Sequence, residues 1–170
     1  MEADFSKGRI AVLGAGKMGG ILVKALIEKH LLSPERVRAT VAHESRAHEL
    51  SHKLGVPITT DNLAAVDGAN LILVCVKPQV VQELMEQIRP KVSPKQLVIS
   101  VAASVHTSQI ESALGGKVPV IRAMPNTPCV LGCGMTALCA GKFAQADRGR
   151  RLTRYDKESL TGCVLCCREH

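Results

Sequence analysis

Three glycines near the start of this 170-residue chain, Gly14, Gly16 and Gly19, are spaced for binding a phosphate group. They follow the apolar run 10–13 and precede a helix-favouring run over 21–29. Such a pattern is typical of a turn that holds the pyrophosphate of a dinucleotide: the first glycine makes the turn, the second lets the backbone approach the phosphates, and the third lets the helix pack on its strand. The N–H groups and positive dipole of the helix N-terminus then face the anion. A tight turn without a ligand is the alternative.

The rest of the chain alternates between apolar runs and helical patterns, and Asp61 is well placed to cap a short helix. Such alternation predicts an α/β fold with a Rossmann-like, doubly wound, mostly parallel sheet, in which ligands bind at the carboxyl ends of the strands. We expect strands over 10–13, 37–41, 56–59, 71–76, 96–101 and 118–123, and helices over 18–30, 45–54, 62–66, 79–88 and 107–114.

Two further loops follow predicted strands, at 76–79 and 100–103. Lys77 precedes Pro78, which favours an extended backbone and lets the ammonium reach a ribose hydroxyl or phosphate; a solvated lysine is the alternative. Ala102 and Ala103 leave space for a flat ring, unless these small residues only relieve crowding. Both loops are expected at the edge of the sheet that carries the glycine turn.

Two asparagines are candidates for contacts with the two ends of a dinucleotide. Pro125 and Pro128 stiffen a loop, expected after the strand at 118–123, that presents Asn126 and Thr127 to the nicotinamide position; a proline-rich turn is the alternative. Asn62 can donate and accept hydrogen bonds toward the adenosine half, or only start a helix.

The choice of cofactor depends on the end of the second strand, where NAD sites carry an acidic residue. No acid stands at this tip, and His43, Ser45 and Arg46 follow it. The hydroxyl and guanidinium favour NADP(H) over NAD(H), whereas Glu44 keeps the choice open. We therefore include His43, Ser45 and Arg46 among the cofactor-binding residues.

Composition argues against several classes of protein. The net charge is +7, but the basic residues are scattered and only 2% of the chain is aromatic, which disfavours nucleic-acid binding. The longest unbroken apolar run is 71–76 and the start has no signal-peptide pattern, so we expect a soluble, cytoplasmic protein without membrane contact. The seven cysteines indicate free thiols, and Cys163-x-x-Cys166 lacks the second pair of a zinc site, so no metal is expected.

Four motifs together, GAGKMG, VKPQ, SVAASV and RAMPNTPCVLGCGMTAL, resemble pyrroline-5-carboxylate reductases over about residues 8–146. GAGKMG alone also suits 3-hydroxyacid and 6-phosphogluconate dehydrogenases, which MPNTP excludes. The resemblance implies NAD(P)H-dependent reduction of 1-pyrroline-5-carboxylate to L-proline, with Met124, Pro125 and Asn126 beside the nicotinamide and the substrate ring. It also implies cofactor contacts from Leu13, Gly14, Ala15, Gly16, Lys17, Met18, Asn62, Cys75, Val76, Lys77, Pro78, Val101, Ala102 and Ala103.

The sequence departs from this family at Cys129, at Cys133 and after residue 147. Family members continue into a helical domain that dimerises and supplies the substrate carboxylate site and the proton donor. We expect an NAD(P)-binding domain over 1–147 and a basic, cysteine-rich, poorly ordered tail over 148–170, as in a truncated and monomeric form without an assigned catalytic residue. Two alternatives are a non-catalytic nucleotide-binding or partner-binding module and a reductase of another imine or ketone.

Overall fold

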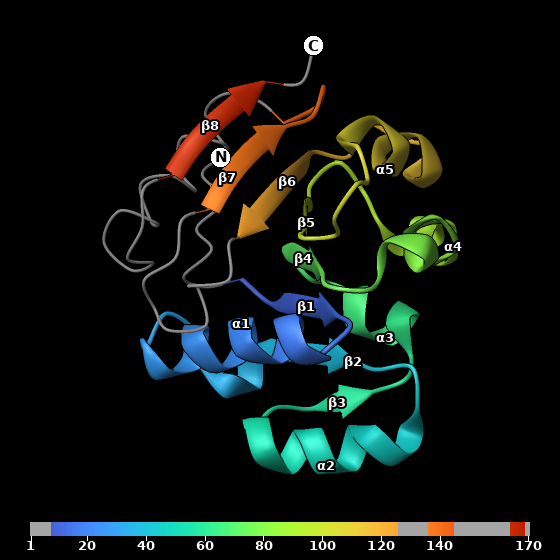
Figure 1. Ribbon diagram of the computed structural model, residues 1–170. Helices are drawn as coiled ribbons and strands as arrows, with labels where there is room; N and C mark the ends of the chain where they lie inside the picture. The colour runs from blue at the N-terminus through green and yellow to red at the C-terminus, as the bar shows by residue number, and fades with distance from the viewer. Residues whose placement is uncertain (1–7, 126–135, 145–163, 169–170) are drawn as a thin grey trace.

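The computed structural model describes residues 8–125, 136–144 and 164–168 (Figure 1). Strands and helices alternate up to the sixth strand, as the sequence predicts. The strands are β1 (Ile10–Leu13), β2 (Val37–Thr40), β3 (Ile58–Thr59), β4 (Leu71–Val74), β5 (Leu97–Ser100), β6 (Val120–Pro125), β7 (Thr136–Ala140) and β8 (Val164–Arg168). The α-helices are α1 (Lys17–Glu28), α2 (Glu44–Leu54), α3 (Asn62–Val66), α4 (Val81–Ile88) and α5 (Thr107–Leu114), and short 3-10 turns are η1 (Pro34–Arg36), η2 (Pro78–Val80) and η3 (Arg89–Lys91).

These strands form one sheet in the order β3-β2-β1-β4-β5-β6-β7-β8 (Figure 1). Neighbouring strands from β3 to β6 are parallel, β7 is antiparallel to β6, and β8 is parallel to β7. The chain builds outward from β1 to β3 and then resumes on the other side of β1 with β4. This switch point lies between β1 and β4, where doubly wound sheets open a crevice at their carboxyl edge. The predicted Rossmann-like, mostly parallel sheet is confirmed.

Helices cover both faces of the sheet, so the central strands are buried on both sides. Val12 packs in one layer with Val23 of α1. Leu13 packs in the other layer with Met85 of α4 and Ile110 of α5. All four residues of β1 and of β4 are buried, which explains why these strands are continuously apolar rather than alternating.

Several predicted boundaries shift by one or two residues. β4 ends at Val74, so that Cys75 already belongs to the following loop. The helix expected over 79–88 begins as the 3-10 turn η2 and becomes α-helical at Val81. Asp61 caps α3 as predicted, because its Oδ1 accepts a hydrogen bond of 3.0 Å from the backbone N–H of Ala64.

The prediction for the end of the sixth strand was wrong. Met124 and Pro125 lie within β6, not in a loop after it, and pair with Ala137 and Thr136 of β7. The antiparallel strand β7, which the sequence analysis did not anticipate, extends β6 by two residues. Proline is tolerated at the last position of the strand because its missing N–H interrupts only the end of the ladder.

Within the segment 148–170, expected to be poorly ordered, the structure describes the strand β8, paired in parallel with β7. The domain boundary at residue 147 stays a prediction. In the described part of the chain, no helix has the length and apolar character needed to span a membrane. No group of three or more metal-ligating side chains occurs among the side chains that the structure describes, and Cys163 lies outside them.

Candidate functional site

The glycine turn joins the end of β1 to α1. Gly14 has a φ of +93°, which side chains rarely allow, and a Cβ there would lie 2.8 Å from Val76 Cγ1 and 3.0 Å from the carbonyl carbon of Cys75. The turn is also fixed from the other side, because the backbone N–H groups of Gly14 and Ala15 donate to the Thr40 carbonyl at 3.1 and 2.7 Å. Gly14 is therefore required by both conformation and space.

The two later glycines have different surroundings. A Cβ at Gly19 would collide with the Gly14 carbonyl oxygen and lie 3.2 Å from Cys75 Cβ, so glycine allows α1 to pack closely on the turn. A Cβ at Gly16 would meet no atom of residues 8–125, 136–144 or 164–168 within 4 Å. The described part of the fold does not require glycine at position 16 for space, and the open space beside its backbone is available to a ligand.

The first turn of α1 is suited to an anion. Gly16 is the N-cap, and no side chain caps this helix end. The first turn contains no acidic residue, and Lys17 is exposed there. Since the first N–H groups of a helix have no partner within it, they are available to phosphate oxygens and add to the positive end of the dipole.

The loop after β4 lies directly against the glycine turn. The Cys75 N–H donates to the Leu13 carbonyl at 2.8 Å, and the Cys75 side chain is half-buried. Burial raises the pKa of the Cys75 thiol to about 12, so the sulfur is a neutral thiol rather than a nucleophilic thiolate near pH 7. Lys77 is exposed, with an extended backbone before Pro78. The loop thus combines a neutral contact surface with an accessible cation.

The two alanines in the loop after β5 have different surroundings. Ala102 is buried among the core residues under α3, α4 and α5, whereas Ala103 is exposed. Val101 joins this loop to the neighbouring strand, because its N–H donates to the Val74 carbonyl at 3.0 Å. Ala102 therefore packs in the core, and Ala103 is the alanine of this loop that is accessible to a ring.

The residues expected near the second strand lie at the start of α2 and α3. His43 is the N-cap of α2, and Ser45 and Arg46 follow in its exposed first turn, together with Glu44. Asn62 opens α3 and is half-buried. Its Oδ1 accepts a hydrogen bond from Thr40 Oγ1 at 2.7 Å, and its Nδ2 donates to Gln87 Oε1 at 2.9 Å.

The substrate-adjacent candidates lie farther along the same edge. Met124 is 44% exposed and Pro125 is half-buried, both at the end of β6, while Asn126 lies outside the described residues. β6 is three strands from β1, which corresponds to about 14 Å at the usual strand spacing. One edge of the sheet therefore brings together the glycine turn, the loops after β4 and β5, and the end of β6.

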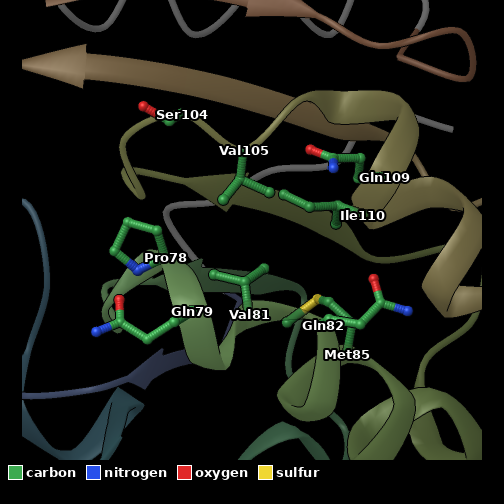
Figure 2. Close-up of a pocket in the computed structure, with 9 residues that line it drawn as sticks. All are labelled: Pro78, Gln79, Val81, Gln82, Met85, Ser104, Val105, Gln109 and Ile110. Carbon is green, nitrogen blue, oxygen red and sulfur yellow. The ribbon is translucent and has the colours of Figure 1, made fainter.

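A pocket of about 390 Å³ lies beside this edge, between the start of α4 and the start of α5 (Figure 2). Val81, Met85, Val105 and Ile110 form its apolar part, with neutral polar side chains around them. None of the described residues that line the pocket is charged, and Pro78 is the one predicted cofactor residue among them. Its described lining therefore offers no cation to a phosphate, whereas the helix N-terminus at the glycine turn offers a positive dipole end.

Two residues that contact the predicted site residues were not predicted from the sequence, Thr40 and Gln87. Thr40 pairs with Leu13 in the sheet register, so a strand alignment places it next to the turn. Gln87 is an exposed glutamine on a helix 25 residues from Asn62, and nothing in its sequence context distinguishes it.

Comparisons with known proteins show the family to which this chain belongs. The family model described as "NADP oxidoreductase coenzyme F420-dependent" matches residues 9–104. The pyrroline-5-carboxylate reductase of Corynebacterium melassecola is 34% identical over 159 residues, covering 92% of this chain and 58% of that protein. The chain belongs to the pyrroline-5-carboxylate reductase family.

Solved structures of pyrroline-5-carboxylate reductases share the fold. The enzyme from Coxiella burnetii aligns with a TM-score of 0.84 at 29% identity, over 96% of this chain and 60% of that chain. The Plasmodium falciparum pyrroline carboxylate reductase, solved with NADP bound, aligns with a TM-score of 0.77 at 18% identity, over 97% of this chain and 58% of that chain. This member of the reductase family thus spans little more than half the length of these relatives.

Proposed function

We propose that this chain binds NADP(H) along the carboxyl edge of β2, β1, β4 and β5, with the pyrophosphate on the glycine turn. The open space beside Gly16 is the observation that carries the proposal: packing requires glycine at positions 14 and 19, whereas at Gly16 no described residue occupies the space of a Cβ and a ligand can use it. The uncapped first turn of α1 and exposed Lys17 supply the donors and the charge for that anion.

The preference for NADP(H) over NAD(H) rests on the start of α2. An adenosine ribose extending from the turn toward β2 comes to His43, Ser45 and Arg46, whose exposed side chains suit a 2′-phosphate. Glu44, in the same turn, is the acid that opposes this preference. The NADP-bound relative from Plasmodium falciparum has the same fold, which supports the same placement of the nucleotide.

The reaction that this site best suits is the reduction of 1-pyrroline-5-carboxylate to L-proline, as in the relatives from Corynebacterium melassecola and Coxiella burnetii. The bound nucleotide supplies a hydride from nicotinamide C4 to the C=N carbon, and the ring nitrogen must carry a proton to become a strong acceptor. Met124 and Pro125 at the end of β6, together with Asn126, are assigned to the nicotinamide and the substrate ring. The neutral Cys75 thiol adds no charge that would repel the phosphates.

Titration of the purified chain with NADPH and NADH, followed by nucleotide fluorescence, tests the cofactor part of this proposal. We expect NADPH to bind about tenfold more tightly than NADH, the value of one charge-assisted contact to the 2′-phosphate. Addition of 1-pyrroline-5-carboxylate is then expected to oxidise NADPH and release L-proline.

The outcomes separate the two parts of the proposal. If NADPH binds but is not oxidised when 1-pyrroline-5-carboxylate is added, the chain is a nucleotide-binding module and the proposed reductase activity is wrong for it. If neither nucleotide binds at millimolar concentration, the site assignment itself is wrong. Equal affinity for NADPH and NADH would contradict only the role of the residues at the start of α2.

A further inference from the structure

A line of side-chain hydrogen bonds crosses three elements beside the glycine turn. Thr40 Oγ1, at the end of β2, donates to Asn62 Oδ1 at 2.7 Å. Asn62 Nδ2 in turn donates to Gln87 Oε1 of α4 at 2.9 Å. Thr40 is 2% exposed, so its hydroxyl has little access to water and the bond to Asn62 satisfies it.

Thr40 links this line to the turn itself. Its backbone carbonyl accepts hydrogen bonds from the Gly14 and Ala15 N–H groups, while its side chain holds Asn62. Asn62 therefore lies next to the segment where the pyrophosphate is proposed to bind. The orientation of its amide therefore decides whether a hydrogen-bond donor or an acceptor faces the nucleotide.

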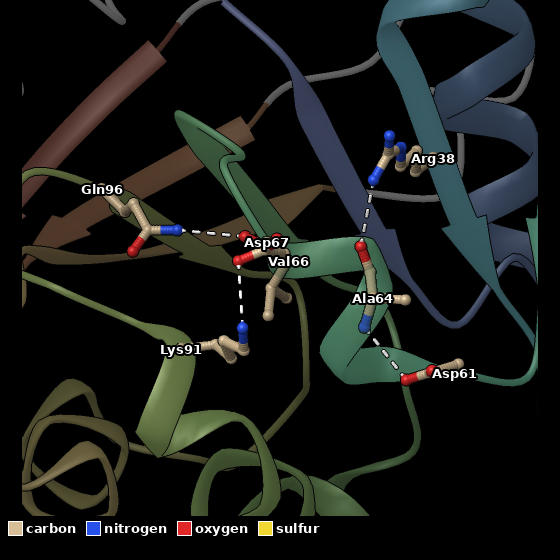
Figure 3. Close-up of polar contacts among 7 residues, drawn as sticks. All are labelled: Arg38, Asp61, Ala64, Val66, Asp67, Lys91 and Gln96. Carbon is tan, nitrogen blue, oxygen red and sulfur yellow. Dashed lines mark hydrogen bonds and ion pairs between the residues drawn. The ribbon is translucent and has the colours of Figure 1, made fainter.

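The backbone of α3 is held independently of Gln87 (Figure 3). Asp61 caps its start through the Ala64 N–H, and Arg38 Nη1 donates to the Ala64 carbonyl at 3.2 Å. At the other end Gln96 Nε2 donates to the Val66 carbonyl at 3.3 Å, and Lys91 pairs with Asp67 at 3.4 Å. Removing the Gln87 side chain therefore leaves α3 in place and affects the amide of Asn62.

The two contacts determine which way that amide faces. A primary amide has an oxygen that accepts and a nitrogen that donates twice, and the two ends are similar in shape. The Thr40 hydroxyl fixes the oxygen end and the Gln87 carbonyl oxygen fixes the nitrogen end. With one Nδ2 hydrogen used by Gln87, the second remains for an acceptor on a ligand.

From this geometry, and resting on the proposed nucleotide site, we propose that Gln87 is a positioning residue that acts through Asn62. It holds the amide so that the second Nδ2 hydrogen donates to a ribose or phosphate oxygen in the adenosine half of the nucleotide. Without Gln87 the amide turns between two orientations, and the one with its oxygen toward the nucleotide repels the same acceptor.

The test measures NADPH affinity for Gln87→Leu, Gln87→Glu and Gln82→Leu, each with and without Asn62→Ala. Gln82 is the matched control, an exposed glutamine of the same helix whose amide contacts Glu86. We expect Gln87→Leu to weaken binding about fivefold, roughly the effect of one lost hydrogen bond, and Gln82→Leu to leave it unchanged. Gln87→Glu keeps an acceptor oxygen and is expected to bind within about twofold of the unmodified chain.

The Asn62→Ala background distinguishes positioning from a general structural effect. There Gln87→Leu is expected to cause no further loss, because the group that it positions is absent. A fivefold loss that persists in that background, or equal effects of Gln87→Leu and Gln82→Leu, would overturn the positioning role. Failure of the unmodified chain to bind NADPH would overturn the nucleotide site as well.

Discussion

Replacing Gly19 by alanine is expected to lower the stability of the chain and to abolish nucleotide binding, whereas the same change at Gly20 is expected to preserve binding and to raise stability slightly. The added methyl group at position 19 collides with the Gly14 carbonyl oxygen, a backbone atom that cannot rotate away. Either α1 moves off the turn or the turn opens. Both movements displace the N–H groups proposed to hold the pyrophosphate.

The expected cost of this overpacking is about 3 kcal/mol, equivalent to a Tm lower by roughly 6–12 °C. At Gly20 the nearest atoms to an added Cβ are the Ala15 carbonyl oxygen at 3.7 Å and Leu54 Cδ1 at 3.9 Å, which are ordinary contacts. Because alanine favours helices, Gly20→Ala is expected to raise stability by about 0.5–1 kcal/mol. Thermal unfolding of the two variants checks the pair, and equal melting temperatures would contradict the packing described for Gly19.

Replacing Gly16 by alanine is expected to weaken nucleotide binding, as at Gly19, but to leave stability nearly unchanged. The Cβ meets no atom of the described residues within 4 Å, so we expect a change in stability below about 0.5 kcal/mol. The methyl group instead occupies the space beside the first N–H groups of α1. Phosphate oxygens can then no longer approach these donors at hydrogen-bonding distance.

Loss of one or two charge-assisted hydrogen bonds corresponds to an affinity for NADPH lower by about tenfold to a hundredfold. Fluorescence titration and thermal unfolding of Gly16→Ala measure the two quantities separately. If Gly16→Ala binds NADPH as the unmodified chain does, the pyrophosphate does not contact this part of the turn. If it unfolds instead, the fold itself needs glycine at this position and the open space is not evidence of a ligand.

Local patterns predicted the central strands and helices well, because in a parallel sheet each strand is buried on both faces and each helix has one buried side. The glycine turn was also predictable, since its spacing reflects one short segment of backbone. Contacts between segments that lie far apart in the sequence could not be predicted in this way. The pairing that carries β6 to Pro125 depends on β7, and the orientation of Asn62 depends on Thr40 and Gln87, 22 and 25 residues away.

The same limit explains the two alanines after β5. Small residues at the end of a strand fit either a ligand surface or a crowded core, and sequence type does not distinguish them. The structure places Ala102 in the core and Ala103 at the surface. Whether a side chain at this loop can contact a ligand therefore depends on whether it faces the core or the surface.

Hydrogen–deuterium exchange with and without saturating NADPH is the measurement that tests the nucleotide site most directly. We expect slower exchange in peptides covering residues 14–20 and 75–79, where the backbone N–H groups of the turn and the neighbouring loop meet the nucleotide, and unchanged exchange in α5. Protection centred on the pocket between α4 and α5, with the glycine turn unaffected, would contradict the account.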